Sequence, residues 1–201
     1  MIRVACIGDS ITWGFTLLKP GKQSYPALLQ EMLGPEYEVR NFGFNDAAAR
    51  FDSDMPYVKR RVYRNSLAWQ PDIVLLMLGT NDTKRRNWDP DIFRRDYSAL
   101  VDAYRDLPSR PRVFLIAPIR VFLPMGFPLL GLYPETMEEG VRPAIRGIAA
   151  DKGLDLIDLR DLFPDSTYMM DGVHPQQKGA RMLAEAIFEA LRPTLAAGGS
   201  R

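Results

Sequence analysis

The sequence of 201 residues contains one histidine, His174, and one cysteine, Cys6. A single cysteine cannot form an intramolecular disulfide, and one histidine with one cysteine falls short of a typical zinc ligand set. Other side chains need a large pKa shift to act as a base near neutral pH. Any acid–base chemistry near pH 7 is therefore expected to depend on His174.

Strong net charge and long apolar segments are also absent. The 26 lysine and arginine residues nearly balance 25 aspartate and glutamate residues, which argues against a nucleic-acid-binding protein. No run approaches the ~20 apolar residues of a membrane span, and residues 2–7 are too short for a secretory signal. Gly21-Lys22 is followed by Gln23, so the phosphate loop of nucleotide-driven enzymes is missing. We expect a cytoplasmic protein with a small-molecule substrate, no nucleic-acid partner and no membrane span.

Apolar segments of strand length alternate with segments long enough for helices. Ile73–Leu78 is apolar at every position, as in a strand buried on both faces of a parallel sheet. We predict an α/β fold at residues 1–195, a three-layer α/β/α sandwich around a five-stranded parallel sheet, and a flexible tail at 196–201. The predicted strands are Ile2–Ile7, Tyr37–Asn41, Ile73–Leu78, Val113–Ala117 and Leu154–Leu159.

Helical spacing of apolar residues is also readable between these strands. It predicts helices at Tyr25–Leu33, Met55–Trp69 and Ile92–Leu107, and a last helix that begins near Pro175 and ends before Pro193. The stretch Ile119–Pro134 is too interrupted by proline and glycine for a regular helix, yet too apolar for an ordinary solvated loop. We expect a substrate, a partner subunit or the body of the domain to cover it, and self-association through it would make the protein a homo-oligomer.

Distinctive polar residues follow four of the predicted strands. Each has an ordinary interpretation: Ser10 as a turn or helix-cap serine, Gly43 as a position that needs positive φ, Asn81 as a turn residue and His174 as a helix-start histidine. However, the carboxyl ends of parallel strands share one edge of a sheet, where ligands bind. The pattern therefore predicts that these residues, which are far apart in sequence, meet in one cleft.

The same segments resemble the SGNH (GDSL-type) hydrolase family, with its blocks in the family's order. They are Gly8-Asp9-Ser10-Ile11-Thr12, Gly43, Gly79-Thr80-Asn81-Asp82 and Asp171-Gly172-Val173-His174-Pro175. After Gly43 many members continue with a serine and a second glycine, whereas this chain has Phe44-Asn45-Asp46. The resemblance implies a flavodoxin-like arrangement of the sheet.

The resemblance also implies roles for individual residues. Ser10 would be the nucleophile, His174 the base and Asp171 the carboxylate that orients the imidazole. The tetrahedral oxyanion would be bound by the backbone N–H groups of Ser10 and Gly43 and by the side-chain amide of Asn81. No metal and no cofactor is required. The candidate substrate-pocket residues are Trp13, Phe122, Met125, Phe127 and Met170.

The leading hypothesis is thus a serine esterase that hydrolyses small to medium carboxylic esters through a Ser10 acyl-enzyme. One alternative is an acyltransferase or perhydrolase, because the apolar stretch Ile119–Pro134 would disfavour water as the acyl acceptor. A carbohydrate O-deacetylase is a second alternative. A binding domain that has kept the fold without the chemistry is a third, and the intact set Ser10, Asn81, Asp171 and His174 argues against it.

Overall fold

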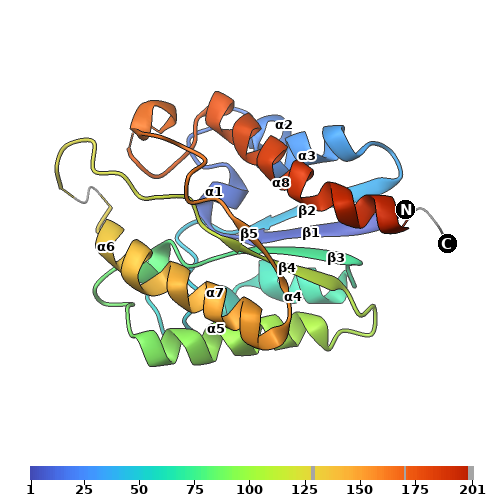
Figure 1. Cartoon of the computed structure of the whole chain (residues 1–201), viewed down its shortest axis with the longest axis horizontal. Coiled ribbons are helices and arrows are strands. Elements are labelled where there is room, and N and C mark those ends of the chain that lie inside the picture. The colour runs from blue at the N-terminus through green and yellow to red at the C-terminus, as the bar shows by residue number, and fades with distance from the viewer. Residues whose placement is uncertain (128–129, 170, 199–201) are drawn as a thin grey trace.

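Five parallel strands form a single sheet in the order β2-β1-β3-β4-β5, with helices on both faces (Figure 1). This computed structural model describes residues 1–127, 130–169 and 171–198, and side chains as far as Pro193. The three-layer sandwich with a five-stranded parallel sheet, predicted from the sequence, is confirmed. The strands are β1 (Ile2–Gly8), β2 (Tyr37–Gly43), β3 (Ile73–Met77), β4 (Arg112–Ala117) and β5 (Asp155–Asp158).

Two layers of helices enclose the sheet. One layer holds α2 (Pro20–Gln23), α3 (Tyr25–Leu33) and α8 (Gln177–Gly198), and the other holds α4 (Arg61–Ala68), α5 (Pro90–Arg105) and α7 (Arg142–Lys152) (Figure 1). The remaining short elements are α1 (Ser10–Trp13), α6 (Pro134–Thr136), a π-helical turn at Met137–Val141, and 3-10 turns at Tyr57–Lys59, Asn81–Thr83 and Ser166–Tyr168.

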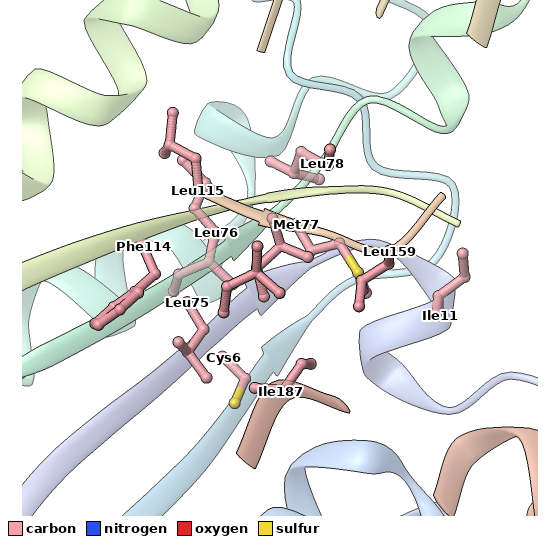
Figure 2. Close-up of a cluster of buried hydrophobic side chains, with 14 of the residues drawn as sticks. Cys6, Ile11, Leu75, Leu76, Met77, Leu78, Phe114, Leu115, Leu159 and Ile187 are labelled. Atoms are coloured by element: carbon pink, nitrogen blue, oxygen red, sulfur yellow. The ribbon is translucent and has the colours of Figure 1, made fainter. Parts of the chain in front are cut away.

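The core lies on both faces of the central strands. Every residue of β3 is buried, as its unbroken apolar pattern predicts. Figure 2 shows Cys6 of β1 close to Ile187 of α8, with Leu115 of β4 on the opposite side of the sheet. Cys6 is fully buried, and burial raises the pKa of its thiol, so the residue packs as a small apolar side chain.

The carboxyl ends of the strands are aligned at one edge of the sheet. Gly8 at the end of β1 pairs with Gly43 at the end of β2 and with Met77 at the end of β3. α1 lies at this edge, whereas the N-terminus and the C-terminal end of α8 lie at the opposite edge (Figure 1). This register brings the loops that follow β1, β2 and β3 together.

Two predicted helices differ from those observed. The segment Met55–Trp69 is helical only from residue 57, because Ala48 exchanges backbone hydrogen bonds with Met55 and Tyr57 and so holds residues 55–57 against residue 48. Helix α8 begins at Gln177 and continues past Pro193 to Gly198, so its predicted end was wrong. Proline lacks an N–H, but this removes one hydrogen bond from the last turns without ending the helix. The division into a domain at 1–195 and a tail stays a prediction, and residues 199–201 lie outside the described part.

The stretch 119–134 forms no helix or strand in its described residues before α6. The body of the domain covers Ile119, Val121 and Leu132, which are buried, while Met125, Phe127 and Leu130 are exposed. Among the described residues, we find no helix with the length and apolarity needed to cross a bilayer.

Candidate active site

Ser10 lies in a tight turn between β1 and α1. Asp9 caps α1, and its Oδ1 accepts a hydrogen bond from the Ile11 N–H at 2.9 Å. Gly8 allows the turn to be this tight, because a Cβ at that position would lie 2.0 Å from Thr12 Oγ1 and 2.8 Å from the Met77 carbonyl oxygen. The turn therefore fixes Ser10 at the carboxyl edge of the sheet, as the first residue of a short helix.

A chain of two side-chain hydrogen bonds links Ser10 to residues near the other end of the sequence. Ser10 Oγ lies 2.8 Å from His174 Nε2, and His174 Nδ1 lies 2.6 Å from Asp171 Oδ2. Ser10 is 8% exposed and His174 is 6% exposed, so little water competes for these bonds. The structure thus brings together the three residues that we predicted as a nucleophile, a base and an orienting carboxylate.

Asp171 is held in place by its own loop. Its Oδ1 accepts hydrogen bonds from the backbone N–H groups of Val173 at 3.0 Å and His174 at 2.8 Å. Burial opposes ionisation of this carboxyl, but the hydrogen bonds from the imidazole and the two N–H groups outweigh it and lower its pKa to about 2. Asp171 is therefore a carboxylate near neutral pH, and it favours the His174 tautomer with its proton on Nδ1.

Asn81 is anchored between two loops at the same edge. Its Nδ2 donates to the Ala47 carbonyl at 3.1 Å, and its backbone carbonyl accepts from Asn87 Nδ2 at 2.9 Å. The neighbouring Asp82 accepts from the backbone N–H groups of Ala49 and Arg50, each at 2.9 Å. A primary amide carries two N–H bonds, so one of them remains for a ligand after the bond to Ala47.

Gly43 does not reach the site as a free donor, contrary to the expectation from the family resemblance. Its N–H donates to Asn41 Oδ1 at 2.8 Å, and the same side chain donates to the Thr12 carbonyl at 2.7 Å. A Cβ at position 43 would lie 2.3 Å from the Trp13 nitrogen. The glycine therefore allows the end of β2 to pack against α1, and we leave it out of the oxyanion site.

Two further carboxyl groups are buried beneath the site. Burial raises the pKa of Asp9 to about 6, although the N–H of Ile11 stabilises its charge. Burial likewise raises the pKa of Asp82 to about 6, against the opposing effect of the Ala49 and Arg50 N–H groups, and the charge of Asp9 raises it further. Asp9 Oδ2 has no hydrogen-bond partner in the described part of the chain. These groups hold the loops of Ser10 and Asn81, and neither contacts the imidazole by a hydrogen bond.

The predicted pocket residues lie in different environments. Trp13, Met125 and Phe127 are exposed by 42%, 64% and 52%, so their rings and thioether are free to contact a ligand. Phe122 is half-buried, and its N–H donates to the Gly172 carbonyl at 2.8 Å, which joins the apolar stretch to the Asp171–His174 turn. Met170 lies outside the described residues.

Phe15 was missed from the sequence. Its ring centroid lies 4.8 Å from that of His174, and the side chain is 46% exposed. Gly14 ends α1 in a left-handed conformation, with φ of 93°, and this reverses the chain so that the next residue returns over the site. Gly14 was a readable signal for a chain reversal at the end of α1, but the contact of Phe15 with a residue 159 positions away was not. Within the described ranges, no three His, Cys, Asp or Glu side chains gather as ligands for a metal ion.

The sequence of the chain is similar to those of known proteins. Residues 6–182 match the model of the GDSL-like lipase/acylhydrolase family. The chain is 35% identical over 211 aligned residues to an acetylxylan esterase from Xylanibacter ruminicola. The alignment covers 95% of this chain but 43% of that protein, so the chain spans less than half the length of this relative.

Solved structures share the fold. A carbohydrate acetylesterase from Sinorhizobium meliloti superposes with a TM-score of 0.79 at 23% identity, covering 96% of this chain and 100% of the other. An aryl esterase from M. smegmatis has a TM-score of 0.77 at 23% identity, with 96% and 99% covered. At this identity the likeness concerns the fold alone, whereas the family match extends over most of the sequence. The chain belongs to the GDSL-like lipase/acylhydrolase family, as the resemblance of its four blocks predicts.

Proposed function

We propose that the protein hydrolyses carboxylic esters through an acyl-enzyme on Ser10. The observation that carries this proposal is the hydrogen-bonded chain from Ser10 Oγ to His174 Nε2, at 2.8 Å, and from His174 Nδ1 to Asp171, at 2.6 Å. Both distances lie within the range required for a nucleophile, its base and the group that orients the base. Family membership supports the same chemistry.

In the first half of the reaction, His174 Nε2 takes the Ser10 hydroxyl proton as Oγ attacks the ester carbonyl carbon. The imidazolium that forms is stabilised by Asp171, which is already ionised. His174 then returns the proton to the leaving alcohol as the bond from the carbonyl carbon to the alcohol oxygen breaks. Water attacks the acyl-enzyme by the reverse sequence, which releases the acid and restores Ser10.

The oxyanion of the tetrahedral intermediate would be bound by two donors. The N–H of Ser10 belongs to the first turn of α1, where backbone donors have no acceptor within the helix. The second donor is the N–H of Asn81 that does not bind Ala47. Each such preorganised donor is commonly worth ~3 kcal/mol in the transition state.

Replacement of Ser10 or His174 by alanine tests this proposal. We expect the turnover of an aryl acetate to fall by several powers of ten in either variant, because nucleophile and base act as one unit. Ser98→Ala, a half-buried serine in the middle of α5, is a matched control that should retain the wild-type rate. Near-wild-type turnover by folded Ser10→Ala or His174→Ala protein would refute the proposal.

A carbohydrate O-deacetylase is the form of this activity that the comparisons favour. The acetylxylan esterase relative acts, as its name states, on an acetylated polysaccharide, and it is 35% identical to this chain. We therefore propose an acetyl group on a sugar as the acyl part of the substrate. Release of acetate from acetylated xylo-oligosaccharides would support this assignment, and activity restricted to aryl and alkyl esters would exclude it. The same product analysis in water–alcohol mixtures distinguishes hydrolysis from acyl transfer.

A further inference from the structure

An open surface pocket outside the catalytic residues lies beside the loop of Asn81. We call it the rim pocket. Its volume is about 370 Å³, and it is lined by Lys84, Arg85, Arg86, Leu130, Gly131 and Tyr133. The two sides of the pocket are joined by a hydrogen bond from the Tyr133 N–H to Thr83 Oγ1 at 3.3 Å. The rim pocket is therefore built from the loop that follows β3 and from the end of the apolar stretch 119–134.

The charges of the rim pocket are only partly compensated. Lys84 Nζ lies 3.6 Å from Asp46 and 3.4 Å from Asp54, and Arg86 also pairs with Asp54. Arg85 is exposed, and no described carboxylate lies within salt-bridge distance of it. Three cations against two carboxylates leave one positive charge in the pocket, and it belongs to Arg85.

The Arg85 guanidinium is oriented by an aromatic ring. Its central carbon lies 4.7 Å from the centroid of Tyr133, within the range of a cation–π interaction. A planar guanidinium held in this way keeps several N–H donors for an anion and has the geometry to bind a carboxylate through two of them. The pocket thus presents a positioned anion receptor and not merely a mobile surface charge.

The rim pocket also lies within reach of the reacting ester. Arg85 lies four positions after Asn81, and since each step along the chain spans at most ~3.6 Å, the two Cα atoms are no more than ~14 Å apart. Lys84, which also lines the pocket, contacts Asp46, and Asp46 adjoins the Ala47 whose carbonyl binds the Asn81 amide. A substrate whose carbonyl oxygen is at Asn81 would therefore need to span no more than about that distance to place its larger portion in the rim pocket.

We propose that the rim pocket is a subsite for a carboxylate on the alcohol portion of the substrate. This inference rests on the proposed ester hydrolysis. With acetyl as the acyl part, a carboxylate at this distance must belong to the leaving group, which points to an acetylated oligosaccharide that carries a sugar acid. Arg85 binds the carboxylate, Tyr133 orients Arg85, and neither takes part in the bond-breaking steps.

The test compares two acetylated xylo-oligosaccharides that differ only in a glucuronic acid substituent. The readout is the ratio of kcat/KM for the acidic substrate to kcat/KM for the neutral one. We expect the wild type to prefer the acidic substrate by about two- to fivefold, the upper part of the range for an exposed ion pair. Arg85→Gln should abolish that preference through KM, and Arg85→Lys should restore part of it, because lysine keeps the charge but not the fork of donors.

Arg61→Gln is the matched control, since Arg61 is an exposed arginine on α4 and the variant removes the same net charge. It should keep the wild-type ratio. The subsite is refuted if the wild type shows no preference, or if Arg61→Gln lowers the ratio as much as Arg85→Gln does. In either case, loss of neutral-ester turnover in Ser10→Ala would still support the proposed hydrolysis, so the two proposals fail separately. Addition of salt should weaken a genuine preference.

Discussion

Replacement of Asp171 by asparagine changes one atom of the proposed catalytic chain. The asparagine carbonyl can still accept the N–H groups of Val173 and His174, which now bond Asp171 Oδ1 at 3.0 and 2.8 Å. Its NH₂ group would then face His174 Nδ1 in place of Oδ2, which now lies at 2.6 Å. The imidazole would be driven to carry its proton on Nε2, where it cannot accept the proton of Ser10. We expect kcat to fall ~10⁴-fold, as in other triads with this substitution.

The same variant should lose stability in a pH-dependent way. The pKa of Asp171 is lowered from 3.8 to about 2, so the folded state favours the carboxylate by roughly 2 kcal/mol. Because the folded pKa lies below the unfolded one, this stabilisation is present above pH 4 and is lost as the pH falls through 2. The free energy of unfolding measured with urea should therefore be lower for the variant than for wild type at pH 7, and this difference should shrink as the pH falls to about 2.

Initial rates with an aryl acetate test the catalytic part of this prediction. KM should change little, because Asp171 is placed to act through His174. Asp165→Asn is a matched control from the preceding turn, where Asp165 caps Ser166–Tyr168 by accepting from the Thr167 N–H at 2.8 Å. Folded Asp171→Asn protein with kcat within about tenfold of wild type would refute the tautomer argument.

Three other substitutions test the remaining parts of the site. Asp9→Asn keeps an oxygen to cap α1 but removes a buried charge. The pKa of Asp9 is raised from 3.8 to about 6, so its ionisation destabilises the fold as pH rises through 6. Between about pH 4 and pH 8, the free energy of unfolding of the variant, measured with urea, should therefore rise relative to that of wild type by up to ~3 kcal/mol. The same difference in unfolding free energy between variant and wild type at both pH values would contradict the raised pKa. Gly43→Ala should lower the free energy of unfolding by ~2 kcal/mol, because the new Cβ would clash with the Trp13 backbone. A variant with wild-type stability but a lower kcat would instead favour a role for Gly43 in binding the oxyanion. Asn81→Ala should lower kcat ~10²- to 10³-fold, and a rate equal to wild type would exclude its amide from the oxyanion site.

The sheet could be predicted because its signals are local. An unbroken apolar run such as Ile73–Leu78 indicates a strand buried on both faces, and polar residues directly after such strands must lie at one edge when the strands are parallel. This is why Ser10 and His174, 164 positions apart in sequence, could be expected to meet and do so. Burial of apolar side chains determines the pattern, and the pattern is visible in the sequence.

The details of the site depended on contacts that no periodicity reveals. The N–H of Gly43 is bound by a side chain two residues earlier, and the ring of Phe15 lies beside the imidazole only because Gly14 reverses the chain. The continuation of α8 past Pro193 likewise shows that a local breaker does not always end a helix. The rim pocket combines cations after Asn81 with a tyrosine from another loop, so only the fold could bring them together.

The most direct test of the central claim is covalent modification with a fluorophosphonate, followed by mass spectrometry of peptides. Such a reagent reacts with a serine whose hydroxyl proton is taken by a neighbouring base. The account predicts one label per chain, on Ser10, in the wild-type protein, and its loss in His174→Ala protein that remains folded. A folded wild-type protein that stays unlabelled, or that carries its label on another residue, would contradict it.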